Sequence, residues 1–440
     1  MKKYIILLCT FIAVFIGLCV TMKVLDKKYG IDEDTYVTQS MNGQEADMLG
    51  SLKGESSVFE MGESGDVIDN PEAAFAEQIV IDAKLNEFDW VYRRNAGITN
   101  ESILKAMEES VGFYAYDAMD DKYKQLYAEI LLVMRGHCVA VPMSSVNANE
   151  IELVSTCVLL DHPEIFYVDG YSYDKYMFAG NVQKIVYTPN YSMDKTEVAE
   201  KTLEIEKCVS ECLQGISGLN SEYEKVKYVY EYVIENTEYN LNAPNNQNIC
   251  SVFLAHQSVC LGYAKAVQFI LQKLGLQCAV VTGFVSTGEA HAWNLVRIDS
   301  HYYYVDATWG DASYLSDMTM NTLTSTNYDY LCITTDDLQK THTTDYPLTL
   351  PFCTSMIHNY YVKEVLYLQN LDGLTLKSVF DEEHIRGGEN LSIRCANRDV
   401  YERVQTELLD GQQIFKYLGN GTSALSYTSN DILYTYTFLL

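Results

Sequence analysis

Two stretches of the chain place apolar residues at helical spacing. Between residues 194 and 216 they recur every three or four positions, which predicts one buried face of a long helix: Val198, Thr202, Ile205, Val209, Cys212 and Ile216. A second helix is expected from Asn220, because Ser221 and Glu224 have the spacing of a capping box. Its apolar face comprises Val226, Val229, Tyr230 and Val233. We interpret both as packing helices without a catalytic role.

A third helical pattern begins directly behind a cysteine, Cys260. Gly275 predicts the end of this helix, and its apolar positions are Ala264, Val267, Leu271 and Leu274. Cys260 therefore falls in the first turn or just before it, where unpaired backbone amides and the helix dipole favour an anion. A thiolate is such an anion and is the reactive form of cysteine. Taken alone, a cysteine in this position is more often structural.

Three strand-like runs follow this helix, at roughly 277–285, 291–298 and 301–308. A two-residue turn at Asp299 and Ser300 would join the last two runs as a hairpin and place His291 opposite Thr308. Asp306 would then lie on the same face as His291, diagonally across the hairpin and within reach of its side chain. A register shift of one residue would put the two on opposite faces.

The flanking regions show mixed patterns and no clear chemistry. Residues 73–193 predict helices and strands in the order 101–111 (helix), 120–134 (helix), 137–143 (strand) and 181–191 (strand). The aromatic-rich stretch 160–174 is expected to be a loop or an edge strand. His137 beside Cys138 would suit a pair of metal ligands, but an ordinary strand position is the better interpretation.

Residues 346–440 predict a small α+β appendage. Its expected elements are two strands and one helix, at 391–397 (strand), 397–418 (helix) and 432–440 (strand). The 35 tyrosines of the chain could line a peptide-binding surface, since tyrosine offers contact area and a polar tip. Ordinary cores and half-exposed strands explain them as well.

The first residues predict attachment to a membrane. Lys2 and Lys3 precede an apolar run from Tyr4 to about Val20, which has the length of a membrane-spanning helix. No small-residue cleavage site is clear, so residues 1–28 are expected to be an uncleaved, single-pass signal-anchor with the bulk of the chain outside the cell. Residues 29–72 are acidic and lack a sustained period, which favours a flexible, solvated tether.

Charge and cysteine usage narrow the choice of partners. The 440 residues carry a formal net charge of −29, so nucleic-acid phosphates and anionic lipid head groups are not expected to bind. The twelve cysteines form no CxxC pair and no zinc-finger set, and no EF-hand loop is present. We therefore predict no metal and no other cofactor. External disulfides stay possible, but their connectivity cannot be deduced from sequence.

Cys260, His291 and Asp306 together suit nucleophilic catalysis. The thiol would attack, His291 would take its proton and later return one to the leaving group, and Asp306 would orient the imidazole. The backbone amide of Cys260 would stabilise an oxyanion. Tyr239 and Gln257 are candidates for a second donor, whereas His256 is a rival base and Cys278 is expected in the core.

Three segments, "VCLGYA", "HAWNLV" and "YYVDATWGD", resemble the catalytic segments of the transglutaminase-like superfamily in order and spacing. The resemblance covers roughly residues 195–315 and implies a papain-like α+β core, in which a helix carrying Cys260 packs on an antiparallel sheet carrying His291 and Asp306. It implies supporting roles for Trp293, Asn294, Trp309 and Tyr263. One departure lies at the hairpin turn, where the family often has Asp-Gly followed by Trp and this chain has Ser300 and Tyr302.

The resemblance implies acyl transfer through a thioester on protein or peptide amides, with an amine or water as acceptor. Relatives with the same triad cleave peptide bonds, so a cysteine peptidase acting on cell-wall or secreted peptides is the alternative enzyme. A non-catalytic surface scaffold is the alternative outside enzymes. The expected organisation is an anchor (1–28), a tether (29–72), an N-terminal α+β region (73–193), the catalytic core (194–345) and a C-terminal appendage (346–440).

Overall fold

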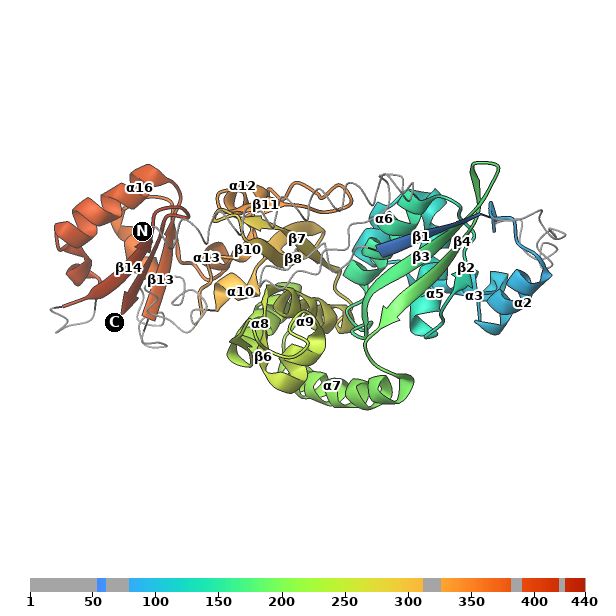
Figure 1. Ribbon diagram of the computed structural model, residues 1–440. Coiled ribbons are helices and arrows are strands. Elements are labelled where there is room, and N and C mark those ends of the chain that lie inside the picture. Colours follow the sequence, from blue (N-terminus) through green and yellow to red (C-terminus); the bar gives the residue numbers. More distant parts are fainter. Residues whose placement is uncertain (1–53, 61–78, 312–325, 381–389, 419–423, 440) are drawn as a thin grey trace, which may run out of the picture. The chain divides into compact units, whose positions relative to one another are not determined.

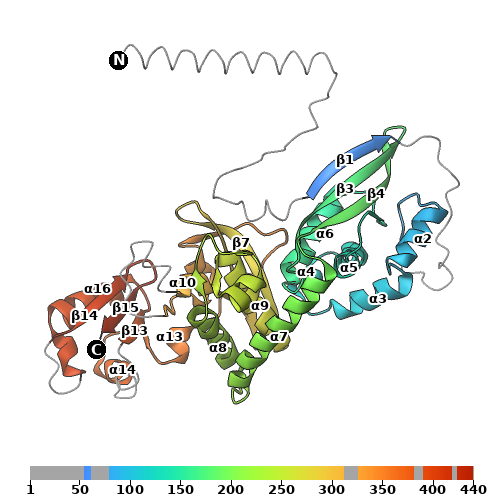
Figure 2. The ribbon, with the colours of Figure 1, turned by 60° about the horizontal axis from the view of Figure 1, so that its bottom comes forward.

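The computed structural model describes residues 54–60, 79–311, 326–380, 390–418 and 424–439, and it mixes helices with antiparallel and parallel strands (Figures 1 and 2). The predicted anchor at residues 1–28 lies outside these ranges. Within them, every helix is too short or too polar to cross a bilayer.

The N-terminal region is a four-stranded sheet with helices packed against it (Figure 1). The strand order is β1 (Gly54–Glu60), β3 (Val168–Phe178), β4 (Asn181–Tyr191) and β2 (Val141–Pro142). The helices are α2 (Glu87–Asn95), α3 (Asn100–Glu109), α4 (Tyr114–Ala118), α5 (Asp121–Arg135) and α6 (Ala148–Asp161). The helices predicted at 101–111 and 120–134 and the strand predicted at 181–191 are confirmed.

The strand β1 corrects the prediction that residues 29–72 form a solvated tether. Seven residues of that segment pair in parallel with β3, from Gly54 opposite Tyr171 to Glu60 opposite Met177. Backbone hydrogen bonds hold this strand, and Phe59 stacks on Tyr176 of β3 with ring centroids 5.4 Å apart. The remainder of the predicted tether lies outside the described residues.

Two further expectations for this region are wrong. Of the strand predicted at 137–143 only β2 forms, because α5 ends in a turn that leaves His137 and Ala140 at positive φ (51° and 53°). The stretch 160–174 contains most of β3, which lies between β1 and β4 and so is not an edge strand. Two of its tyrosines, Tyr171 and Tyr173, contact Glu152 of α6, and Tyr171 donates to the carbonyl of Glu152 at 3.4 Å.

Two helices lead into the part that carries the predicted chemistry. The helix α7 (Lys195–Ile216) begins after Asp194 and buries most of the expected stripe, while Thr202 is exposed. The helix α8 (Glu222–Glu235) begins with the predicted capping box of Ser221 and Glu224. A short π-helix, η3 (Ser251–Ala255), and a two-stranded pair, β5 (Glu238–Tyr239) and β6 (Gln257–Ser258), precede α9 (Cys260–Lys273).

The helix α9 packs on a five-stranded antiparallel sheet. Its strand order is β10 (Leu331–Ile333), β9 (His301–Val305), β8 (Ala290–Ile298), β7 (Cys278–Val285) and β11 (His342–Thr344). Alternate residues divide the sheet between two cores: Val280 and Val296 join the cluster around α9, whereas Val281 and Leu295 join a cluster on the opposite face. The expected fold of a cysteine-bearing helix on an antiparallel sheet is confirmed. Two short helices, α10 (Ala307–Gly310) and α12 (Thr335–Leu338), flank the sheet strands.

The hairpin between β8 and β9 has the predicted two-residue turn, and Ile298 pairs with His301. Asp299 and Ser300 both have positive φ, 46° and 76°. This is the combination that tight hairpin turns require and that glycine adopts without steric cost. Ser300 therefore stores backbone strain at the position where the chain departs from the family pattern.

Replacing Ser300 by glycine is expected to stabilise the protein by about 0.5–1 kcal/mol, because relief of the left-handed strain exceeds the entropy cost of glycine. The urea midpoint of unfolding, followed by tryptophan fluorescence, measures this change. Ser286→Gly is the matched control: Ser286 is equally an exposed serine in the neighbouring β7–β8 turn, but it lacks a positive φ. It should destabilise, and an equal shift for both variants would contradict the strain argument.

The C-terminal region has its own sheet and its own apolar cluster. The strand order is β12 (Tyr367–Leu368), β13 (Asn390–Cys395), β15 (Thr435–Leu439) and β14 (Ser426–Asn430). The helices are α13 (Tyr360–Lys363), α14 (Gly373–Val379), α16 (Arg398–Arg403), a π-helix η4 (Val404–Asp410) and a 3₁₀-helix η5 (Gln413–Lys416). The helix predicted at 397–418 is thus three consecutive helical pieces, with a break at Gln412, whose φ is 54°.

Candidate active site

Cys260 is the first residue of α9 and is 3% exposed. Val259 precedes it at the N-cap position and makes no side-chain hydrogen bond to the helix, so no capping side chain covers the first amides. These amides and the helix dipole favour negative charge at this end of α9. The sulfur therefore lies where the sequence predicts it, at a helix terminus suited to an anion.

The chain before Cys260 is fixed by close contacts. The Val259 amide donates to the carbonyl of Asn246 at 3.2 Å, and the Ser258 hydroxyl donates to the same carbonyl at 2.9 Å. Ser258 Oγ also lies 2.6 Å from Ser251 Oγ. A Cβ at Gly262 would lie 1.9 Å from Ser258 Oγ, so only glycine allows this approach. The position of the sulfur is consequently set by packing on both sides of it.

His291 and Asp306 form a buried pair beside this cysteine. His291 Nε2 lies 2.8 Å from Asp306 Oδ2, and each residue is 2% exposed. The other carboxylate oxygen, Oδ1, accepts the backbone N–H groups of Thr308 (3.0 Å) and Trp309 (3.1 Å), because Asp306 is also the N-cap of α10. The carboxylate is thereby oriented by the backbone, and it orients the imidazole in turn.

The charges of the pair follow from this geometry. Burial lowers the pKa of His291, but the charge and hydrogen bond of Asp306, with a further hydrogen bond to Cys260, outweigh it and raise the pKa to about 10. Burial raises the pKa of Asp306, but the charge and hydrogen bond of His291 hold it well below its usual range. Both pKa shifts therefore favour a positively charged His291 beside a negatively charged Asp306. Since Nε2 faces Asp306, Nδ1 is the nitrogen that can exchange a proton with the sulfur.

The contact between His291 and Asp306 arises differently from the predicted register. The strand β9 ends at Val305, which pairs with Asn294, so Thr308 is not opposite His291. His291 instead pairs with Gly283 of β7. The chain turns into α10 because the Asp306 side chain caps that helix, and this turn brings the carboxylate back over the end of β8. The predicted proximity is right, but its predicted cause, a hairpin extended to residue 308, is wrong.

A second histidine, His342 on β11, also contacts the carboxylate. Its Nε2 lies 3.2 Å from Asp306 Oδ2, and the residue is 2% exposed. Sequence reasoning missed it, because "QKTHTTDY" carries no motif and lies 36 residues beyond Asp306. The available signal was Gly283, since a glycine inside a strand marks a close approach. A Cβ there would lie 2.0 Å from the Thr343 carbonyl of β11.

Among the described residues, His291, Asp306 and His342 are the group whose potential ligand atoms lie close enough to hold a metal ion, within 4.8 Å of one another. A bound ion would have to replace both hydrogen bonds to the carboxylate. The expectation that no metal is needed stays a prediction, which dialysis against EDTA can check.

Trp293 and Asn294 lie on β8 and brace the site. The Trp293 ring stacks on His291 with centroids 6.0 Å apart and meets His342 edge-on at 4.9 Å. The Asn294 amide donates to the carbonyls of Ala264 on α9 (2.9 Å) and Ala279 on β7 (3.3 Å). Asn294 therefore ties the cysteine-bearing helix to the sheet.

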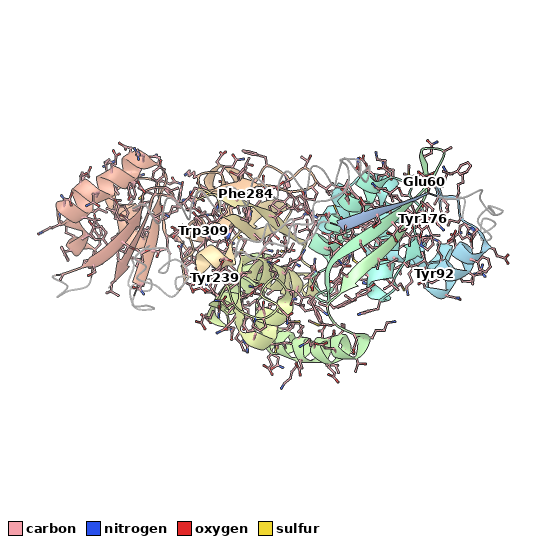
Figure 3. The ribbon with its side chains drawn as sticks, in the orientation of Figure 1. Glu60, Tyr92, Tyr176, Tyr239, Phe284 and Trp309 are labelled. Atoms are coloured by element: carbon pink, nitrogen blue, oxygen red, sulfur yellow. The ribbon has the colours of Figure 1, made fainter. Side chains whose placement is uncertain are left out.

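Tyr263 and Trp309 complete the set of predicted supporting residues. The Tyr263 hydroxyl donates to the Thr237 carbonyl and contacts Asp311 Oδ2, both at 2.8 Å. Trp309 lies on α10 (Figure 3). Its ring packs on His342 at 4.7 Å and on His291 at 6.0 Å. Both tryptophans confine the imidazole rings. In this geometry neither the tryptophans nor Tyr263 are needed for proton transfer.

The weaker candidates are placed as follows. Gln257 Nε2 donates to Glu238 at 3.0 Å, so its amide is engaged on the surface. Tyr239 lies on β5 with its ring 6.4 Å from that of Tyr263. His256 is exposed, and its Nδ1 lies 3.1 Å from the Asn236 carbonyl. This contact does not suit the role of a rival base. Cys278 is 1% exposed on β7, in the core as predicted.

Comparison with known proteins identifies this part of the chain. Residues 210–307 match the sequence model of the transglutaminase-like superfamily, and Cys260, His291 and Asp306 all fall inside the match. The segment is a transglutaminase-like core. Over 122 residues the chain is 25% identical to the kyphoscoliosis peptidases of Mus musculus and Homo sapiens, covering 24% of this chain and 18% of each relative. The match thus spans less than a fifth of those relatives.

Two solved structures show local similarity to the transglutaminase-like core. One is a TGase with 18% identity and a TM-score of 0.24, covering 32% of this chain and 44% of that chain. The other is the periplasmic domain of TgpA from Pseudomonas aeruginosa bound to ethylmercury, with 15% identity and a TM-score of 0.20, covering 30% of this chain and 58% of that chain. The family assignment rests on the sequence match.

Two cavities adjoin the transglutaminase-like core at opposite ends of α9. One, of about 680 Å³, is lined by Ile234, Glu235, Asn236, Thr237, Glu238, His256 and Asp311. Asp311 joins it to the first turn of α9 through Tyr263, so this cavity lies at the Cys260 end of the helix. Its three carboxylates make it suited to a cationic group.

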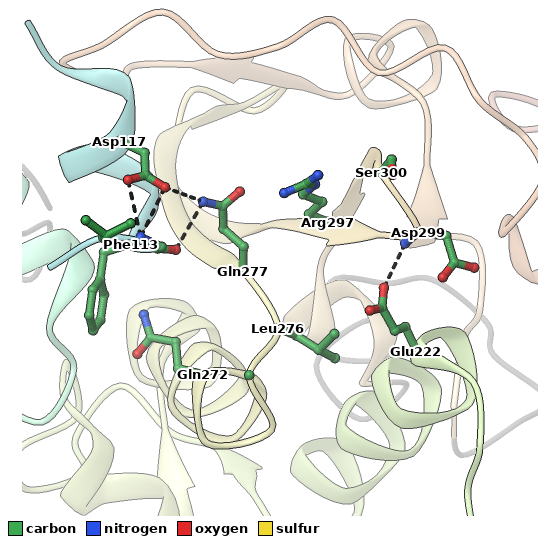
Figure 4. Close-up of a pocket in the computed structure, with 12 residues that line it drawn as sticks. Phe113, Asp117, Glu222, Gln272, Leu276, Gln277, Arg297, Asp299 and Ser300 are labelled. Atoms are coloured by element: carbon green, nitrogen blue, oxygen red, sulfur yellow. Dashed lines mark hydrogen bonds between the residues drawn. The ribbon is translucent and has the colours of Figure 1, made fainter. Parts of the chain in front are cut away.

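The second cavity, of about 580 Å³, lies at the other end of α9 and at the hairpin turn (Figure 4). Gln277 donates to Asp117 at 3.1 Å across it, and Glu222 accepts the Asp299 amide at 2.7 Å. Because α9 has 14 residues, its two ends are roughly 20 Å apart. This cavity is therefore separate from the sulfur of Cys260, although Ser300 lines it.

Proposed function

We propose that the protein is a thiol-dependent acyltransferase or hydrolase that acts on carboxamides of proteins or peptides. The observation that carries the proposal is the buried pair of His291 and Asp306, joined at 2.8 Å, together with Cys260 at a helix terminus, where it contributes to the raised pKa of His291. A nucleophile, a base and an orienting group in this order are what acyl transfer requires.

At the start of the first step the proton of the Cys260 thiol lies on His291 Nδ1, since the raised pKa of the imidazole favours its protonated form, and the sulfur attacks the carboxamide carbon. The backbone amide of Cys260 stabilises the oxyanion. The C–N bond then breaks, His291 returns the proton to the leaving ammonia or amine, and a thioester remains. In the second step, an amine or water gives a proton to His291 and attacks the thioester, and the thiolate leaves.

An amine acceptor is supported by the cavity at the Cys260 end of α9. Glu235, Glu238 and Asp311 line it, and a lysine side chain or another cationic amine would be attracted to these carboxylates. With such an acceptor the product is an isopeptide cross-link, whereas water gives deamidation.

A cysteine peptidase is the second candidate, favoured by the name of the curated relatives. The same proton transfers cleave a peptide bond when the leaving group is a backbone amine. A non-catalytic scaffold is the third candidate, and it would need no contact between Cys260 and His291.

The predicted anchor at residues 1–28 and the predicted extracellular location would place the substrate at the cell surface.

Incubating the protein with a glutamine-containing peptide and a labelled primary amine separates these candidates. We expect the label to be incorporated into the peptide, because the thioester partitions to the amine, and mass spectrometry measures the adduct. Peptide fragments without label would instead indicate a peptidase. Intact, unlabelled and undeamidated peptide, combined with uniform slow alkylation of all cysteines by iodoacetamide, would favour the scaffold.

A further inference from the structure

We propose that His342 is a positioning residue of this site, which donates its Nε2–H to Asp306 and holds the carboxylate in the orientation that His291 needs. This inference rests on the proposed function, because it assigns a role within the same group of residues. The contact is direct: His342 Nε2 and His291 Nε2 approach the same oxygen, Asp306 Oδ2, at 3.2 and 2.8 Å.

The proton on His342 can be assigned from its partners. A carboxylate only accepts hydrogen bonds, so Nε2 must carry a proton to make this contact favourable. Nδ1 lies 2.8 Å from the hydroxyl of Thr341, whose oxygen lies 3.1 Å from the Tyr330 hydroxyl. Thr341 Oγ1 also lies 3.4 Å from the Leu338 carbonyl, but its shorter contact is the one with His342 Nδ1. In the resulting relay Tyr330 donates to Thr341, Thr341 donates to His342 Nδ1, and His342 donates to Asp306.

The opposite tautomer is disfavoured. A proton on Nδ1 could be donated to the carbonyl of Leu338. The unprotonated Nε2 would then face the Asp306 carboxylate, so two acceptors would lie 3.2 Å apart with no proton between them. Burial lowers the pKa of His342, and the neighbouring charge of His291 adds to this although Asp306 opposes it. His342 is therefore a neutral donor, while His291 carries the charge that the reaction uses.

Packing fixes the His342 ring in this orientation. It contacts the rings of Trp309 (4.7 Å), Trp293 (4.9 Å) and Tyr330 (5.4 Å). Asp306 consequently accepts four hydrogen bonds, two on each oxygen. Without His342, Oδ2 would be held only by the imidazole that it is meant to orient.

The test compares His342→Phe with His342→Gln in the intact protein. Phenylalanine fills the aromatic enclosure without a donor, whereas the glutamine amide can still donate to Asp306. The readout is the second-order rate of Cys260 alkylation by iodoacetamide, measured by peptide mass spectrometry. The thermal midpoint of unfolding is measured for each variant as well. We expect the rate to fall by about 10- to 100-fold in His342→Phe, as loss of a hydrogen bond to a charge implies, and to stay within about threefold in His342→Gln.

A second variant, Thr341→Val, keeps the volume and removes the hydroxyl that sets the tautomer. It should slow alkylation by about threefold to tenfold without a comparable loss of thermal midpoint. His358→Phe is the matched control, because His358 is also buried and also lies 3.2 Å from a carboxylate, but at the hairpin turn on Asp299. It should leave the rate unchanged.

A wild-type rate in His342→Phe would overturn the proposal. So would equal losses in the phenylalanine and glutamine variants that follow their thermal midpoints, since that result indicates packing alone. Alkylation needs no substrate, so it also separates this inference from the proposed function. If the peptide and the amine give no product while alkylation of Cys260 is still slowed in His342→Phe, only the proposed function fails.

Discussion

Replacing Cys260 by alanine is expected to lower amine incorporation and amide hydrolysis by about 10⁴-fold or more, to the background of the assay. The reason is that the sulfur forms the bond to the substrate and no other group at the N-terminus of α9 can replace it. The thermal midpoint should change little by comparison with the activity, because the variant removes a single buried sulfur atom.

Cys278→Ala is the matched control for this prediction. Cys278 is also a buried cysteine, at 1% exposure, but it lies on β7 in the core. Its replacement should reduce stability and leave the turnover within about threefold, as expected for a packing residue. Retention of more than a tenth of the activity in Cys260→Ala, or equal alkylation of both cysteines by iodoacetamide, would contradict the assignment of the nucleophile.

The elements around Cys260 could be predicted because their signals are local. Ser221 and Glu224 are three residues apart and cap α8, and the apolar spacing behind Cys260 ends at Gly275 within one helix. Asp299 and Ser300 form a two-residue turn that sets the pairing of β8 with β9. In each case the residues that decide the structure are neighbours in the sequence.

The missed features depend on pairing between distant segments. The strand β1 has few apolar residues and is held by backbone hydrogen bonds to β3, more than a hundred residues later, so composition could not predict it. His342 reaches Asp306 because β11 pairs with β7, with His342 opposite Val285. Neither contact has a sequence motif. Gly283 was the one local sign that another backbone comes close at this place.

The site predicted from the sequence was also incomplete for Asp306, because this residue has two structural roles. Asp306 could be predicted as the partner of His291 from the resemblance, but its capping of α10 changes how it reaches the imidazole. The same capping makes the carboxylate unusually sensitive to replacement, because both of its oxygens already accept hydrogen bonds from N–H donors.

Asp306→Asn is expected to lower turnover by about 10³-fold or more, close to the loss that follows when an orienting carboxylate becomes an amide. If the amide oxygen caps α10, the amide NH₂ faces His291 and His342, which both present N–H groups in the native site. His291 must then move its proton to Nδ1, where it can no longer accept the proton of the thiol. If the amide is reversed, the NH₂ faces the backbone N–H groups of α10 and the cap is lost.

The pH profile distinguishes this mechanism from a general loss of structure. In the native protein the imidazolium of His291 supplies the proton for the leaving ammonia, so turnover should fall as the pH rises through about 10, the pKa of His291. In Asp306→Asn the charge that raises this pKa is gone and burial, which lowers it, dominates. The alkaline fall of the residual activity should therefore move toward neutral pH by more than one unit.

Turnover measured from pH 6 to 11 checks this shift, with Asp311→Asn as the matched control. Asp311 is another buried aspartate, 3% exposed and five residues further along, and its carboxylate lies 2.8 Å from the Tyr263 hydroxyl, a contact that an asparagine side chain can also make. It should keep the native alkaline limit. An unchanged limit in Asp306→Asn, with activity lost at every pH, would mean that the carboxylate maintains the fold and does not set the charge of His291.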